Sequence, residues 1–152
     1  MKFISILFLL IAFNSTAHID RTNYFSVFES NSLVKIEAQI NSLRTEEPST
    51  DKDAFLGAMI MKKAQFMKTP KEKIAIFKEG KTLLENAIAQ QAKNATYRFL
   101  RLAVQENCPK ILKYNTKIES DAGFVKLHFA SLSNVASRAV KRYAKESKHL
   151  SL

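Results

Sequence analysis

Three strong hydrogen-bond donors interrupt an apolar run in the second half of the chain. Arg98, Arg101 and Gln105 lie in the segment Tyr97–Tyr114, whose pattern is otherwise that of a buried helix. With successive helical residues about 100° apart, the three side chains share a stripe about 60° wide. A guanidinium group binds a carboxylate or a phosphate through two parallel hydrogen bonds. The stripe therefore predicts a binding site for an anionic ligand.

The same stripe has a second interpretation, as part of an internal ion-pair network. Stacked helices commonly neutralise a buried arginine with a carboxylate from a neighbouring helix. The candidate carboxylates are Glu85, Glu106, Glu119 and Asp121. The network is the favoured interpretation, but both require the same donors on the same face of the helix.

Other residues offer little for catalysis or for metal binding. Cys108 is the single cysteine, and it lies near a predicted helix C-terminus, where the helix dipole disfavours a thiolate. His128 shares a predicted helix with Phe124 and Leu132. No spacing of His, Cys, Asp or Glu matches a metal site. We therefore predict a non-enzymatic protein without catalytic residues, metal or cofactor, in which Cys108 is a buried small residue.

Residues 1–17 have the pattern of a secretory signal peptide. A lysine follows the first methionine, and Phe3–Phe13 is apolar but too short to span a bilayer. Small residues predict cleavage between Ala17 and His18. We therefore predict a periplasmic or secreted protein whose mature part, 18–152, is a single domain without a transmembrane span.

The C-terminal segment is strongly basic, in a chain whose formal net charge is +10. Its cationic residues are Arg138, Lys141, Arg142, Lys145 and Lys148. A basic amphipathic helix can lie on an anionic lipid or polymer surface. Its apolar side has few large residues, which favours the alternative of a solvated last helix. Specific nucleic-acid binding is not expected of an exported protein.

Composition and periodicity predict an all-α fold. The chain has three glycines and three prolines, and apolar residues recur at three- and four-residue spacing after the signal. We expect six to eight helices in antiparallel hairpins, or in an orthogonal bundle. Gly80 lies on an apolar helix face, where glycine costs about 1 kcal/mol relative to alanine. A close approach by a neighbouring helix is the expected reason.

Capping residues and prolines predict where the helices begin and end. The expected elements are a short helix capped by Asp20 or Thr22, a helix starting within Ser30–Ser32, a loop over Thr45–Asp53, a helix over Ala54–Met67, a helix opened by Thr69 and Pro70, a helix from Asn94 to Pro109, and two last helices over Ile118–Leu132 and Asn134–Lys148. A faint repeat of helix, polar break and helix relates the first half of this series to the second, since Phe55 and Leu56 recur as Phe99 and Leu100.

The segment LLENAIAQQAKNATYRF, Leu83 to Phe99, resembles the junction between tetratricopeptide (TPR) repeats. Ala92 stands where that junction has proline, and the regular 34-residue spacing is absent. A longer pattern looks like a group of small exported bacterial helical proteins. It comprises Gly80-Lys81, Tyr97–Leu102, Gln105, Pro109, Leu112, Tyr114 and Asp121. This resemblance implies a TPR-like helical fold. It implies no catalytic activity and no requirement for a cysteine at position 108.

The sequence thus favours an exported helical binding or scaffold protein. The first candidate contact surface lies between the helix of Gly80 and the helix of Arg98. Its expected partner is a protein or an anionic component of the cell envelope. The alternative is peripheral binding to an anionic envelope surface through the basic C-terminal segment.

Overall fold

The structure, a computed structural model, describes residues 18–152. The predicted signal peptide and its cleavage site lie outside the described residues. Within 18–152 the chain forms seven α-helices and three short 3-10 turns, and no strand. The helices are α1 (Arg21–Glu29), α2 (Leu33–Thr45), α3 (Thr50–Lys63), α4 (Pro70–Gln90), α5 (Ala95–Asn107), α6 (Ile118–Leu127) and α7 (Asn134–Ala144), and the turns are η1 (Ala64–Phe66), η2 (Lys110–Leu112) and η3 (Phe129–Ser131). The predicted all-α fold is confirmed.

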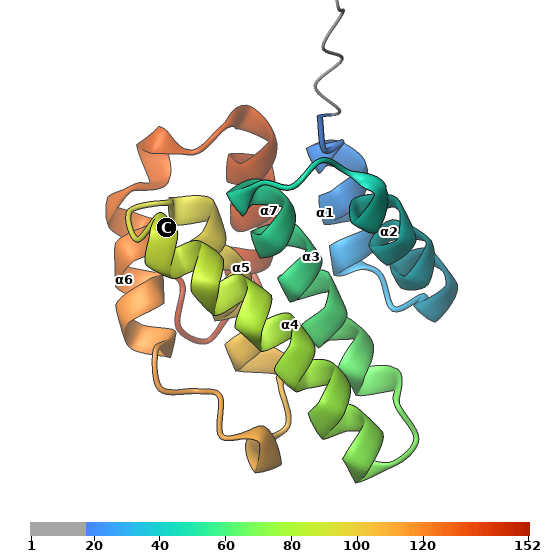
Figure 1. Cartoon of the computed structure of the whole chain (residues 1–152). Helices are drawn as coiled ribbons and strands as arrows, with labels where there is room; N and C mark the ends of the chain where they lie inside the picture. The colour runs from blue at the N-terminus through green and yellow to red at the C-terminus, as the bar shows by residue number, and fades with distance from the viewer. Residues whose placement is uncertain (1–17) are drawn as a thin grey trace, which may run out of the picture.

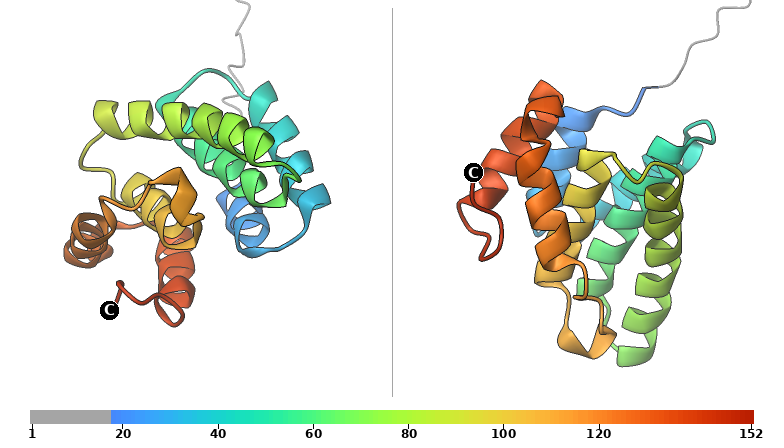
Figure 2. Two further views of the ribbon diagram at one scale, coloured as in Figure 1. Left: turned by 90° about the horizontal axis from the view of Figure 1, so that it is seen from below. Right: turned by 90° about the vertical axis from the view of Figure 1, so that its left-hand side faces the viewer.

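Helix α3 lies at the centre of the arrangement. It packs along α4 and also contacts α2 and α5. From α2 to α5, successive helices run in opposite directions (Figure 1). Helix α6 packs on α5, whereas α7 returns to contact α1, so that the last helix lies beside the first (Figure 2).

Helix α3 is buried over most of its length. Every residue from Ala54 to Met61 is buried, as its uninterrupted apolar sequence predicts for a central helix. The run is short, and none of the helices within 18–152 has the length and apolar character needed to cross a bilayer.

Helices α3 and α4 approach each other at two glycines. A Cβ atom added to Gly80 would lie 2.4 Å from the carbonyl oxygen of Gly57, and one added to Gly57 would lie 2.6 Å from that of Gly80. Both contacts are with backbone atoms, which cannot move aside as the end of a flexible side chain can. The close approach predicted from Gly80 is confirmed, and its partner is Gly57.

Of the two alternatives for the first cap, Asp20 caps α1, and Ser32 caps α2 within the predicted run Ser30–Ser32. The predicted caps at Thr69 and Asn94 are also present. At Thr69 the cap is reciprocal. The backbone N–H of Glu72 donates to the Thr69 hydroxyl over 3.2 Å, and the backbone N–H of Thr69 donates to the Glu72 carboxylate over 3.0 Å. Local hydrogen bonding of this kind depends only on neighbouring residues, which is why the sequence predicts it well.

The loop predicted over Thr45–Asp53 is too long, because α3 begins at Thr50. The side chain of Ser49 caps the helix, and Asp51 lies in the first turn. Acidic residues there are stabilised by the positive end of the helix dipole. The polar residues after Pro48 therefore open a helix rather than extend the loop.

Helices α3 and α6 end earlier than predicted, at Lys63 and Leu127. The turns η1 and η3 follow them almost directly. A tightened 3-10 turn is a common way to satisfy the last carbonyl groups of a helix.

The last helix ends at Ala144 and does not reach Lys148. The carboxylate of Glu106 on α5 accepts hydrogen bonds from the Ser147 hydroxyl at 2.8 Å and from the backbone N–H of Lys148 at 3.2 Å. Leu150 is then buried, with 2% of its surface exposed. These contacts hold the C-terminal residues against α5 in a non-helical path.

The four tyrosines of the chain each join two segments distant in sequence through a buried or half-buried phenol. Tyr24 donates to the carbonyl oxygen of Phe55 over 2.9 Å. The other three donate to carboxylates, Tyr97 to Asp51, Tyr114 to Glu85 and Tyr143 to Glu106. Burial, reinforced by the carboxylate in these three, raises the pKa of each tyrosine well above its usual value.

We predict that Gly80→Ala lowers the free energy of unfolding by about 1–3 kcal/mol, because the new methyl group meets backbone at the α3–α4 contact. The matched control is Gly123→Ala on α6, where an added Cβ meets nothing within 4 Å. That variant should be more stable by about 0.5–1 kcal/mol, since alanine favours the helix. Urea unfolding of both proteins measures the difference, and two equal responses would contradict a tight helix contact.

We predict that the folded protein shows no tyrosinate absorbance near pH 10, where a free phenol ionises. A group whose pKa is raised by folding contributes stability that is complete below its unfolded pKa and is lost as the pH rises above it. Stability should therefore fall above about pH 10, and the tyrosines should ionise together with unfolding. Tyrosinate absorbance and far-ultraviolet circular dichroism, recorded in one alkaline titration, measure both. Ionisation near pH 10 with intact helices would contradict the buried phenols.

Candidate functional site

Arg101 on α5 forms a buried ion pair with Asp121 on α6. Its Nε lies 2.7 Å from Oδ2 of Asp121, and its Nη2 lies 2.8 Å from Oδ1. Its remaining nitrogen, Nη1, donates to Glu85 on α4 over 2.8 Å. Burial opposes the charge of Arg101, but the hydrogen bonds and charges of the two carboxylates outweigh it and raise the pKa of Arg101. The guanidinium group thus joins three helices.

Arg98 and Gln105 complete the surroundings of Asp121. Nε of Arg98 lies 2.6 Å from Oδ1 of Asp121, in a close ion pair, and its guanidinium carbon is 4.5 Å from the ring centroid of Phe124. Gln105 donates to Asp121 over 3.3 Å and accepts from the backbone N–H of Lys117 over 2.9 Å, just before α6 begins.

The three residues of the predicted stripe therefore converge on one carboxylate. Arg101 and Gln105 are 5% and 3% exposed, and Asp121 is fully buried. These are the contacts of an internal network, with Asp121 and Glu85 as the partners among the four candidates. A ligand role for Arg98, Arg101 and Gln105 stays a prediction.

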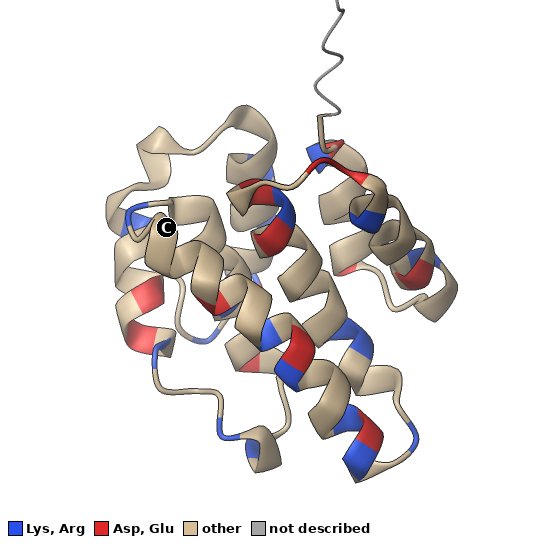
Figure 3. Ribbon diagram, viewed as in Figure 1, with Lys and Arg blue, Asp and Glu red and all other residues tan. Residues whose placement is uncertain are grey.

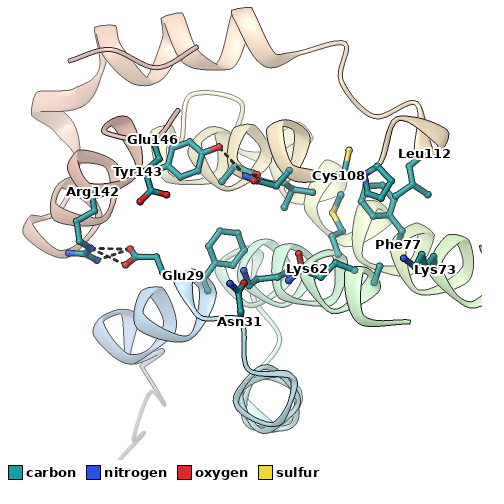
Figure 4. Close-up of a pocket in the computed structure, with 18 of the residues that line it drawn as sticks. Glu29, Asn31, Lys62, Lys73, Phe77, Cys108, Leu112, Arg142, Tyr143 and Glu146 are labelled. Carbon is teal, nitrogen blue, oxygen red and sulfur yellow. Dashed lines mark hydrogen bonds and ion pairs between the residues drawn. The ribbon is translucent and has the colours of Figure 1, made fainter. Parts of the chain in front are cut away.

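A separate groove of about 650 Å³ lies between α3 and α4 on one side and α5 and α7 on the other (Figure 4). Its apolar lining includes Phe28, Met61, Ala64, Phe77, Val104 and Leu112. All of these except Leu112 are buried, with less than a tenth of the surface exposed. The groove is thus a depression over the hydrophobic core.

The two ends of this groove differ in chemistry. At one end Arg142 binds Glu29 through two nitrogens, at 2.8 and 3.0 Å, and joins α7 to α1. At the other end Phe77, Cys108 and Leu112 lie together, with Lys73 beside them (Figure 4). One end is therefore closed by an ion pair, and the other is mainly apolar.

Three lysines of the groove have no ion-pair partner among the described residues. They are Lys62, Lys73 and Lys145. Nζ of Lys62 lies 5.6 Å from the ring centroid of Phe28. Burial lowers the pKa of Lys62, and the negative charge of Glu29 opposes this shift. The groove thus presents a partly desolvated cation above an apolar floor.

Cys108 lies at the apolar end of the groove and is half-buried. Its Sγ is 3.5 Å from the carbonyl oxygens of Gln105 and Tyr114. Burial raises the pKa of the thiol, so it stays protonated near neutral pH. The ring of His128 stacks on Phe124 with centroids 3.9 Å apart, and its Nδ1 lies 3.0 Å from the carbonyl oxygen of Phe124. Within 18–152 no cluster of His, Cys, Asp and Glu could hold a metal ion.

The basic C-terminal residues lie on the surface, and all five are exposed. Arg142 is held by Glu29, and Lys141 lies 5.6 Å from the ring centroid of Phe129. Of the apolar residues of α7, Ala136, Ala139 and Val140 are buried, and Val135 and Tyr143 are partly buried against the core. A surface role of this segment would therefore depend on charge.

The groove differs from the contact surface expected between α4 and α5. It includes residues of both helices, but it uses Ala103, Val104 and Asn107 on the face of α5 that points away from Asp121. Lys62 is the residue that sequence reasoning missed. The signal available was a lysine directly after the uninterrupted apolar run of α3.

We predict that Asp121→Ala costs about 3–5 kcal/mol of unfolding free energy, because it leaves two arginine side chains without their shared carboxylate. The thermal midpoint should fall by on the order of 10 °C or more. Glu79→Ala is the matched control, since it breaks the exposed pair with Arg44. Its effect should stay below about 1 kcal/mol. Equal midpoints for the two variants would contradict a structural role for the network.

Comparison with known proteins identifies no relative of the chain. No protein-family model matches it, nor does any curated protein or solved structure. The predicted resemblance to small exported helical proteins stays a prediction.

Proposed function

We propose that the chain is an exported, non-enzymatic binding protein whose ligand occupies the groove between α3–α4 and α5–α7. The observation that carries the proposal is Lys62, which is partly buried over the Phe28 ring and has no carboxylate partner among the described residues. A desolvated ammonium group gains more from an anion than an exposed one, because less water competes for it.

The apolar floor selects the rest of the ligand. Small-molecule sites are typically concave and mostly apolar, with a few polar groups that fix orientation, and the groove volume falls in their range. The ligand class that fits is a small organic anion with an apolar body, its charge near Lys62 and its body against Met61 and Phe77. Such binding requires no catalytic residue.

Export and the TPR-like relationship belong to the same proposal. Export is supported by the signal-peptide pattern of residues 1–17. The TPR-like relationship is supported by the two hairpins α2–α3 and α4–α5. Each opens its second helix with a polar cap and then buries a Phe-Leu pair, Phe55-Leu56 and Phe99-Leu100.

A second candidate is peripheral binding to an anionic envelope surface through the C-terminal segment. The observation in its favour is that Arg138, Lys141, Lys145 and Lys148 are exposed and form no ion pair with a described residue. The buried apolar side of α7 limits this contact to electrostatic attraction, which is weakened by salt.

We predict that dodecanoate, a single-chain carboxylate, binds the mature chain and that dodecyltrimethylammonium does not. Lys62→Met keeps the length of the side chain and removes its charge, so the Kd for dodecanoate should rise at least about tenfold. The matched control is Lys63→Met, because Lys63 is the next residue and pairs with Glu37 at 2.8 Å outside the groove.

Isothermal titration calorimetry measures these affinities, and circular dichroism verifies that both variants are folded. Equal Kd values for the Lys62 and Lys63 variants would rule out the groove as the site. Equal binding of the anionic and cationic amphiphiles would rule out selection by charge.

A further inference from the structure

One end of the molecule combines exposed aliphatic side chains with a concentration of lysines. It is formed by the start of α4 and by the η2 turn, which both lie at the lower end of Figure 1 and of the right-hand view of Figure 2, and which both contribute to the lining of the groove. We define the α4–η2 end as residues 68–74 and 109–113. It is separate from α7 in sequence and lies on other elements.

Two isoleucines of this end face solvent. Ile111 in η2 is 70% exposed, and Ile74 in the first turns of α4 is 48% exposed. The other strongly exposed large apolar residues among the described ones, Val34, Leu127 and Leu152, belong to other elements. Single exposed apolar residues are common on protein surfaces, so the two isoleucines alone do not indicate a binding surface. The residues around them must also be considered.

The surrounding charge is almost entirely positive. The cationic residues are Lys68, Lys71, Lys73, Lys110 and Lys113, none of which pairs with a described carboxylate, and the one acidic residue is Glu72. Figure 3 shows Lys and Arg positions in blue at the start of α4 and around η2. The carboxylate of Glu72 is engaged in the helix cap at Thr69.

The backbone conformation at the end of η2 is unusual for a lysine, which indicates that the lysine side chain is needed there. Lys113 has φ 48° and ψ 41°, the left-handed conformation, and it is the one non-glycine residue within 18–152 with a positive φ. Glycine or asparagine adopts this conformation at lower cost. Lys113, two residues after Ile111, therefore carries its charge at a position where glycine or asparagine would cost less.

We propose that the α4–η2 end docks on an anionic lipid surface, with Ile111 and Ile74 entering the interface and the lysines contacting headgroup phosphates. The cations of this end are all lysines, which act as flexible point charges, whereas fixed two-pronged recognition of a protein or nucleic acid favours arginine. Isolated aliphatic side chains among such charges suit a fluid bilayer, which has no pockets to match. This proposal is independent of the groove ligand.

Vesicle co-sedimentation of residues 18–152 tests it, with vesicles of phosphatidylcholine alone and of phosphatidylcholine mixed with phosphatidylglycerol. We expect binding to the mixed vesicles, none to the neutral ones, and at least a tenfold loss of affinity in high salt. Absence of binding to the anionic vesicles overturns the proposal. Binding to both vesicle types overturns the role of charge.

Two charge-matched triple variants locate the contact. Lys71→Gln/Lys110→Gln/Lys113→Gln should weaken vesicle binding at least tenfold, whereas Arg138→Gln/Lys141→Gln/Lys145→Gln should change it less than threefold. The reverse result assigns the contact to the C-terminal segment and overturns the proposal. Equal losses of vesicle affinity in the two triple variants also overturn the proposal, because binding would then depend only on the net charge of the protein.

The Ile111→Ser variant tests the insertion of Ile111 into the bilayer separately from the electrostatic attraction of the lysines, since it leaves the charge of the protein unchanged. We expect a three- to tenfold weaker affinity for the mixed vesicles, with the same dependence on salt. An unchanged affinity overturns the insertion of Ile111. Circular dichroism verifies folding, and dodecanoate binding should be unchanged in this variant and in the first triple variant, because the substituted residues do not line the groove.

Discussion

The backbone contact between Gly57 and Gly80 determines how closely α3 and α4 can pack, and the floor of the groove depends on it. Met61 follows Gly57 by one helical turn, and its Cγ would lie 2.7 Å from a Cβ added to Gly80. Phe77 precedes Gly80 by about one turn on α4 and also lines the groove. A wider helix separation would change the positions of both side chains, so the two glycines position the floor as well as the core.

The second half of the chain is joined to this pair of helices largely through charged and phenolic groups. Arg101 links α4, α5 and α6 through Glu85 and Asp121, and Tyr114 donates to the same Glu85. A buried ion pair gains little over apolar packing, but the loss of one partner is costly. We infer that the network determines the position of α6 relative to α5, because hydrogen bonds are directional and apolar contacts are not.

The groove and the α4–η2 end are neighbouring features with different chemistry. Lys73, Pro109 and Leu112 belong to both, since they line the groove and lie within 68–74 and 109–113. Lys62 is partly buried over the Phe28 ring, where reduced solvent access strengthens its attraction for an anion. A chain with both proposed functions would hold the apolar end of its groove close to a lipid surface.

The sequence by itself determined the all-α fold and most helix starts, because capping and periodicity act between neighbours or along one helix. It also indicated a close approach at Gly80 from the cost of a glycine on an apolar helix face, but not that Gly57 is the partner. It also placed Arg98, Arg101 and Gln105 on one face. Only the tertiary structure decided that all three side chains contact Asp121 and that Arg101 also pairs with Glu85. It also decided that α7 ends at Ala144 and that Lys62 forms no ion pair with a described carboxylate. Those outcomes depend on which side chains of distant helices meet, and a periodic pattern contains no information on distance between helices.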